Sequence, residues 1–389
     1  MQKIPQAIPN LNGDEAELLQ SCIESTFVSS VGPFVTEFEN RIAALSGVDQ
    51  AAVVCSGTVA LQMAFEGLGI GQNDLVMMPS LTFIATSNAI SHARAQPWLV
   101  DVTAENWTID LDLCRRLIQS ETDPNPAGPG RIHRATGQVL RALAPVMVMG
   151  ASFDFAAVIA LAHDFDLHVV VDAAAAIGGQ AQGGVALAAT GVDAVCYSFN
   201  GNKTVTCGGG GAVASADPEL IQRIKHLTTT GRVGGNYDHD VIAYNFRMTN
   251  VQAAIGVAQL RRLDGFLQAK AAHHATYSDL AAAFSDLDPF PEAAKGQSTY
   301  WFSGVYYTGD DMSVCDAFRT HMNDAGVDLR MFWKPIHLQT PYAACLKSDM
   351  PVCDDLWKRL FPLPCSTHLT EAEMTLVTTA SRAFWSAQA

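Results

Sequence analysis

Three features of the sequence combine a polar or reactive side chain with small or apolar neighbours. Lys203 lies between an apolar segment and the four glycines at 208–211. Partial burial would depress the pKa of this lysine and make its amine nucleophilic toward an aldehyde. Most lysines are surface residues, so the position by itself leaves an ordinary solvated cation as the alternative.

The second feature is Asp172, the only charged residue at the end of the apolar run 169–171. A carboxylate in such a place needs a cationic partner, because otherwise its pKa rises. A pyridinium nitrogen, a metal ion or a structural arginine would serve, and the residues around Asp172 do not choose between them.

The third feature is the segment 56–58, Ser-Gly-Thr, between a predicted strand and a predicted helix. Small residues let the backbone close on an anion, and the free N–H groups at a helix start favour negative charge. An ordinary helix N-cap is the simpler interpretation of this segment alone. Together the three features match pyridoxal 5′-phosphate, which needs a phosphate anchor, a carboxylate on its ring nitrogen and a Schiff-base lysine.

These residues follow strands of a predicted α/β fold, where such sheets bind ligands. Up to residue 255, apolar segments alternate with helical segments, which indicates a largely parallel, doubly wound sheet. The expected strands are 51–54, 74–79, 97–102, 144–149, 167–171, 194–199 and 212–214. The expected helices are 14–26, 35–46, 59–67, 82–92, 111–119 and 155–165.

The pattern changes toward the C-terminus. Residues 249–266 have the spacing of one long amphipathic helix, and residues 300–307 form the clearest strand beyond it. We expect an N-terminal arm and large domain over residues 1–264 and a small C-terminal α+β domain over residues 265–389. The segment 121–138, rich in Pro, Gly and Arg, is expected to be a surface loop.

Composition excludes several classes of function. The 389 residues include 39 acidic and 24 basic side chains, and the net charge of -15 disfavours binding to nucleic acid or to an anionic membrane. Apolar runs fall far short of the roughly 18 residues that a membrane span needs, and we see no signal peptide. The nine cysteines include no CxxC pair, and metal-binding motifs are absent. We therefore expect a soluble, cytoplasmic protein with reduced thiols and no metal site.

Longer motifs resemble one family of pyridoxal-phosphate enzymes. Over nearly its whole length the chain is similar to the DegT family of nucleotide-sugar aminotransferases. The motifs that carry this resemblance are residues 32–39, 56–61, 79–86, 171–174, 198–203 and 244–254. Residues 300–302 and 333–337 resemble the branch that aminates C4 of 4-keto-6-deoxy-N-acetylhexosamine nucleotides for bacillosamine and legionaminic acid pathways.

The resemblance implies a fold type I architecture, with a mostly parallel sheet of the seven-stranded type, and a role for each matching residue. Lys203 would form the Schiff base and then move a proton between the cofactor and the sugar carbon. Asp172 would pair with the ring nitrogen, and Phe83 would stack on the ring. The residues implied in phosphate binding are Ser56, Gly57, Thr58, Ser198 and, from a second subunit, Asn245. Such sharing implies an obligate homodimer.

The same resemblance suggests contacts with the nucleotide sugar, although scaffold or surface roles remain open. The candidate residues are Phe34, Arg247, Arg330, Trp333, Lys334 and His337. Because cofactor and substrate are anions, the cations of this set should gather with Lys203 at the cleft. One position departs from the family pattern: Ala175 stands where members usually carry Gln, His or Glu near the ring hydroxyl.

The expected reaction moves an amino group from L-glutamate to C4 of the keto sugar. Relatives in which His replaces the lysine are sugar dehydratases, so the presence of Lys203 favours transamination. The alternatives are another fold type I reaction, including 3-amination or dehydration of a nucleotide sugar, and a protein that binds pyridoxal phosphate without turnover.

Overall fold

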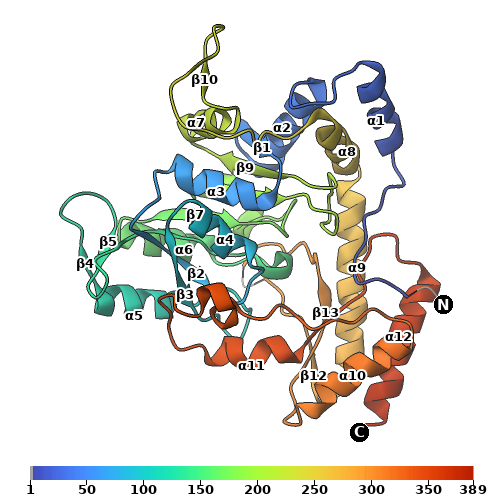
Figure 1. Cartoon of the computed structure of the whole chain (residues 1–389). Coiled ribbons are helices and arrows are strands. Elements are labelled where there is room, and N and C mark those ends of the chain that lie inside the picture. Colours follow the sequence, from blue (N-terminus) through green and yellow to red (C-terminus); the bar gives the residue numbers. More distant parts are fainter. Residues whose placement is uncertain (1–2, 294, 389) are drawn as a thin grey trace.

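The computed structural model describes residues 3–293 and 295–388, which are built around a nine-stranded sheet with helices on both faces (Figure 1). Seven strands follow the order β1-β9-β8-β7-β6-β2-β3, and β5 and β4 extend the sheet beside β6. The strands are β1 (Gln50–Val54), β2 (Asp74–Pro79), β3 (Gln96–Val100), β4 (Thr122–Pro124), β5 (Arg131–His133), β6 (Val139–Leu143), β7 (His168–Asp172), β8 (Ala194–Ser198) and β9 (Gly211–Ser215).

The direction of the strands brings several carboxyl ends to one edge. All pairings from β8 through β7, β6 and β2 to β3 are parallel. Strand β9 is antiparallel to both β1 and β8, so β1 runs in the same direction as β7 and β8. The predicted mostly parallel sheet is therefore confirmed, and the ends of β1, β7 and β8 share the edge at which such sheets bind ligands.

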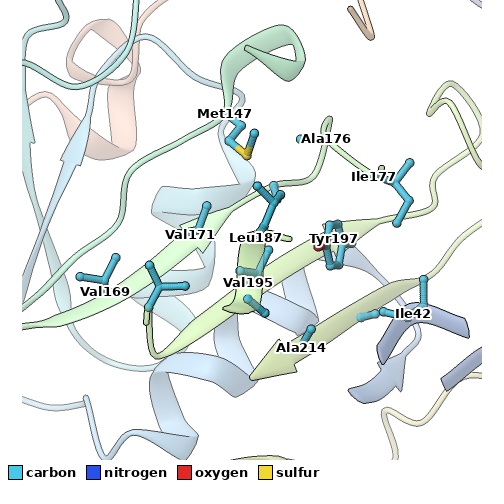
Figure 2. Packing of buried hydrophobic residues seen from close by; sticks show 14 of the residues in the cluster. Ile42, Met147, Val169, Val171, Ala176, Ile177, Leu187, Val195, Tyr197 and Ala214 are labelled. Carbon is cyan, nitrogen blue, oxygen red and sulfur yellow. The ribbon is translucent and has the colours of Figure 1, made fainter. Parts of the chain in front are cut away.

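Two layers of helices cover the sheet, and each encloses its own apolar core. One layer contains α3 (Gly57–Gly67), α4 (Ala85–His92) and α7 (Pro218–Thr228). The other contains α2 (Pro33–Ser46), α5 (Leu111–Glu121), α6 (Phe155–Asp164) and α8 (Asn250–Leu260). Successive strand residues point to opposite layers, because side chains alternate along a strand. Figure 2 shows Val169, Val171 and Val195 in the second core, with Ile42 of α2 nearby.

Two predicted elements are wrong in place or extent. The strand expected at 144–149 is β6, five residues earlier, and it pairs with β2 and β7. Pro145 has no N–H for a sheet ladder, and Met149 adopts the left-handed φ of 55° inside a short 3-10 turn, so the strand ends before them. The helix expected over 249–266 is two helices, because the chain bends at Arg262 before α9 (Leu263–Ala281) begins.

The segment 121–138 lies at the surface, as predicted, but it is not a plain loop. Strands β4 and β5 form a hairpin, and β5 continues the central sheet by pairing antiparallel with β6. The Arg134 side chain donates to the Thr122 carbonyl at 2.8 Å, which ties the hairpin to its own base.

The C-terminal part forms a second, smaller body. Its three-stranded antiparallel sheet is β12 (Leu287–Pro289), β13 (Ser303–Tyr307) and β14 (Leu360–Leu363), packed with α9, α10 (Ser313–Asp324) and α12 (Glu371–Ser386). The predicted boundary after residue 264 falls inside α9. The N-terminal arm also belongs here, since the Ile4 N–H donates to the Gly326 carbonyl and Ile4 joins this core.

Two further helices and a hairpin lie outside these groups. Helix α1 (Glu15–Glu24) precedes α2 and packs on α8, and α11 (Pro351–Arg359) leads into β14. A two-stranded hairpin of β10 (Arg232–Val233) and β11 (Asp238–His239) projects from the large body (Figure 1). Among residues 3–293 and 295–388, no helix combines the length and apolar character that crossing a bilayer requires.

Candidate active site

A cleft of about 330 Å³ opens at the carboxyl edge of β1, β7 and β8. Its lining includes Ser56, Gly57, Thr58, Phe83, Asp172, Ala175, Ser198, Lys203 and Trp333 from the sequence analysis. Lys203, Asp172 and the segment 56–58 therefore meet in one cavity. Among the described residues that line it, Lys203 is the only lysine or arginine.

Asp172 is the last residue of β7, and it is 5% exposed. One carboxylate oxygen accepts from the Thr86 hydroxyl at 2.6 Å, and the other accepts from the Ala174 N–H at 3.0 Å. Burial raises the pKa of the Asp172 carboxyl, while these two bonds and the Lys203 charge oppose the rise. The carboxylate is thus held in one orientation and lacks a full countercharge, which suits it to a cationic ring nitrogen.

Lys203 follows β8 in a turn closed by its own N–H, which donates to the Asn200 carbonyl at 3.0 Å. Burial lowers the pKa of the Lys203 amine to about 8, although attraction to Asp172 acts in the opposite direction. Near neutral pH this amine is mostly protonated, but its neutral fraction is far larger than that of an ordinary lysine, and attack on an aldehyde requires the neutral form.

The start of α3 forms an anion cradle. Ser56 caps the helix by accepting from the Val59 N–H at 3.2 Å, and the N–H groups of Gly57 and Thr58 have no partner within the helix. A Cβ at residue 57 would lie 2.6 Å from the Ser198 Cβ, so only glycine lets β8 approach this closely. The helix N–H groups and the hydroxyls of Thr58 and Ser198 thus lie together where a phosphate could bind.

An aromatic wall bounds the cleft on the side of the small body. Phe83 is 54% exposed, and its ring contacts Trp333 edge-on with centroids 5.7 Å apart. Trp333 lies 5.9 Å from Trp301, measured between ring centroids. An exposed phenyl face inside a cleft is unusual for a folded chain and fits a flat ring as its missing neighbour.

The wall next to Asp172 is apolar. It consists of residues 146–149 together with Ala174 and Ala175. The Ala175 carbonyl accepts from the Thr299 hydroxyl at 2.9 Å, so this backbone position is tied to the segment before β13. A ring hydroxyl placed here would meet no polar side chain from residue 175.

His337 does not enter the cleft. One ring nitrogen lies 2.7 Å from the Ser80 hydroxyl, and the other lies 3.0 Å from the Asp354 carboxylate. With both nitrogens engaged and the residue 6% exposed, His337 joins the end of β2 to α11. The expectation of a substrate contact is therefore corrected to a structural role.

Of the other expected substrate residues, Trp333 lines the cleft and the remaining four lie outside its lining. Phe34 is half-buried at the start of α2, and Arg247 is half-buried in a bridge with Val54 at the end of β1. Lys334 is exposed, as is Arg330, which pairs with Asp328 at 2.8 Å. The cations do not gather with Lys203 within one chain.

Asn245 is exposed and lies in a bridge with Thr229, outside the lining of the cleft of its own chain.

Sequence reasoning missed two residues that shape the site, Thr86 and Trp301. Both lie inside the family motifs 79–86 and 300–302, but neither side chain has a charge that would single it out. Among the described residues, no three or more His, Cys, Asp or Glu side chains form a group that could hold a metal ion.

Comparison with known proteins identifies the class to which this site belongs. Residues 9–382 match the DegT/DnrJ/EryC1/StrS aminotransferase family, and the chain belongs to it. It is accordingly a sugar aminotransferase that depends on pyridoxal 5′-phosphate, with the fold type I architecture, and the predictions of enzyme class, fold and cofactor are confirmed.

Individual relatives are similar along nearly the whole chain. GDP-perosamine synthase of Escherichia coli O157:H7 is 32% identical over 99% of this chain and 100% of its own length. The dTDP-3-amino-3,4,6-trideoxy-alpha-D-glucose transaminase of Streptomyces venezuelae is 32% identical over 90% of this chain and 87% of its own. The solved structure of S. venezuelae DesV with a ketimine intermediate has a TM-score of 0.84 at 29% identity, covering 95% of this chain and 94% of that chain.

Proposed function

We propose that this aminotransferase transfers an amino group from L-glutamate to C4 of a 4-keto-6-deoxyhexose linked to a nucleotide, for the synthesis of bacterial surface amino sugars. The observation that carries the chemistry is the meeting of Lys203, Asp172 and the anion cradle in one cleft. The similarity to GDP-perosamine synthases favours C4 and a GDP-linked sugar. This similarity gives less support to the 4-keto-6-deoxy-N-acetylhexosamine nucleotide that the sequence motifs suggested as substrate.

Several residues of the cleft have a part in this proposal. When bound, pyridoxal phosphate supplies an aldehyde that carries the amino group and a ring that takes up electrons. Ser56, Gly57, Thr58 and Ser198 bind its phosphate at the start of α3. Phe83 covers one face of the ring, and the Asp172 carboxylate keeps a proton on the ring nitrogen.

Lys203 has two tasks. Its neutral amine would hold the cofactor by its aldehyde between turnovers. The Lys203 Nζ would also accept and return a proton at the reacting carbons, first as a general base and then as an acid. A pKa of about 8 suits both directions of transfer near neutral pH.

The remaining expected contacts are part of the proposal. Trp333 lines the cleft and offers an apolar face to the sugar. Arg247, Arg330 and Lys334 would contact the nucleotide from outside that lining. Asn245 would reach the phosphate site of a second copy in a homodimer, which agrees with its exposure and with its place outside the lining of its own cleft.

The test is a substrate panel with the purified enzyme and glutamate. GDP-, UDP- and dTDP-linked 4-keto-6-deoxy sugars, with and without a 2-acetamido group, are each supplied, and 2-oxoglutarate and the amino sugar are measured. We expect the GDP-linked sugar to be aminated at C4 with the highest kcat/KM. Lys203→Ala should abolish turnover and the visible absorption of the lysine-bound cofactor. Full activity of Lys203→Ala would refute the assigned chemistry, and exclusive turnover of a UDP-linked acetamido sugar would return the substrate to the first expectation.

A further inference from the structure

Trp301 is a buried residue of the cleft that the proposed roles do not use. It lies just before β13, is 2% exposed, and reaches the cleft from the small body. The Lys203 Nζ stands 3.6 Å from the centroid of its indole ring. The indole Nε1–H donates to the Asn202 carbonyl at 2.7 Å.

We propose that Trp301 is a positioning residue, which holds the Lys203 amine and the turn that carries it within reach of the cofactor aldehyde. The inference rests on the proposed role of Lys203 and adds the group that orients it. Two separate contacts support it. The N–H bond fixes the backbone one residue before Lys203, and the ring face attracts the ammonium group directly.

Trp301 is itself firmly held. Lys270 of α9, 3% exposed, donates to the Trp301 carbonyl and to the Cys365 carbonyl, each at 2.7 Å. The Trp301 ring also stacks on Phe302 with centroids 4.0 Å apart. The buried Lys270 thus joins the backbone of Trp301 to the segment after β14. The indole in turn is bonded to the Asn202 carbonyl of the large body, so Trp301 links the two bodies.

Such a constraint is needed because a lysine side chain has four rotatable bonds. Its Nζ must bond to the aldehyde carbon with release of one water, and it is set free as a primary amine whenever another amine takes its place. A free amine that turned toward solvent would lose its alignment for the proton transfer and for its return to the aldehyde carbon. The indole face holds the released Lys203 amine inside the cleft, close to the reacting atoms.

The experiment compares the apoproteins of wild type, Trp301→Phe and Trp301→Leu. Pyridoxal phosphate is added, its capture is followed by visible absorbance, and the product is reduced with borohydride and mapped to Lys203 by mass spectrometry. In parallel, Lys203 is labelled with trinitrobenzenesulfonate, a small reagent that needs no fixed orientation. We expect capture to slow by about tenfold or more in Trp301→Leu and by less in Trp301→Phe, which keeps an aromatic face. Labelling by the small reagent should not slow.

Slow capture with undiminished labelling supports a positioning role. Capture at the wild-type rate in both variants, or an equal fall in capture and labelling, would overturn it. Should Trp301→Leu fail to fold, Trp301→Phe decides, since it removes only the N–H bond and part of the ring. Trp357→Phe is the matched control, because Trp357 also lies beside a lysine, with the Lys358 Nζ 5.8 Å from its ring, but outside the cleft. Failure of the wild-type apoprotein to attach pyridoxal phosphate at Lys203 would instead refute the proposed function.

Discussion

The burial of Lys203 makes a prediction about the stability of the apoprotein. A fall in the pKa of this amine from 10.5 to about 8 corresponds to roughly 3 kcal/mol of unfavourable burial of the charged form. Because the amine opens onto a solvent-filled cleft, we discount this value to about 1–3 kcal/mol. Lys203→Met should therefore raise the free energy of unfolding of the apoprotein at pH 7, against the usual direction for an active-site substitution.

The pH dependence of this stability difference shows whether the charge on Lys203 causes it. Below about pH 8 the folded and unfolded chains both hold the Lys203 proton, so the wild type bears the full cost. Between pH 8 and 10.5 only the unfolded chain keeps it, so wild-type stability rises with pH and the advantage of Lys203→Met shrinks. The lost attraction to Asp172 acts as a constant offset for as long as Lys203 remains charged.

The assay is urea unfolding of both apoproteins at pH 7, 8, 9 and 10, in which the difference in unfolding free energy is the measured quantity. Lys347→Met, at an exposed lysine whose Nζ donates to the Ala343 carbonyl, is the control and should give a difference that hardly changes with pH. An advantage of Lys203→Met that stays constant from pH 7 to 10, or that grows, would refute the reasoning.

Two further substitutions test other parts of the site. Gly57→Ala would place a Cβ 2.6 Å from the Ser198 Cβ and push β8 and α3 apart, so we expect a loss of about 1–3 kcal/mol in stability and weaker binding of pyridoxal phosphate by titration. An unchanged cofactor affinity would show that the cradle is not the phosphate site. His337→Leu should lower the urea midpoint by the equivalent of about 1–3 kcal/mol, because it leaves the buried Ser80 hydroxyl without its ring partner. Its KM for the nucleotide sugar should stay at the wild-type value, and a large rise in KM at wild-type stability would restore His337 to the substrate site.

The sequence was a good guide where local chemistry decides structure. Asp172 and Ser56 could be placed at strand ends because apolar runs and capping residues are recognisable from a few neighbouring positions. The strand expected at 144–149 failed because the run continues through Pro145, and only the pairing partners of β6 show where the ladder stops. Register across a sheet depends on residues far away in the sequence.

Contacts between distant segments were the harder part of the site. Trp301 reaches Lys203 from almost a hundred positions away, and its sequence neighbours give no sign of that partner. His337 was expected at the substrate because residues 333–337 resemble a family motif, whereas its partners Ser80 and Asp354 come from separate elements. Arg330 and Lys334 have the right charge for a diphosphate, but charge alone does not specify where a flexible side chain points.

The attachment of the N-terminal arm to the small body also affects how the chain folds. The Gln6 side chain donates to the Pro362 carbonyl at 3.0 Å across 356 residues of sequence, and the Cys365 N–H donates back to the Gln6 carbonyl. Contacts of such large separation close a long loop, and their entropic cost must be met before they contribute stability. During synthesis the large sheet can form before the arm has its partners. The small body, which holds Trp301 and includes α12, is complete only after residue 386 has left the ribosome. Assembly of the cleft is therefore a late event in the life of each chain.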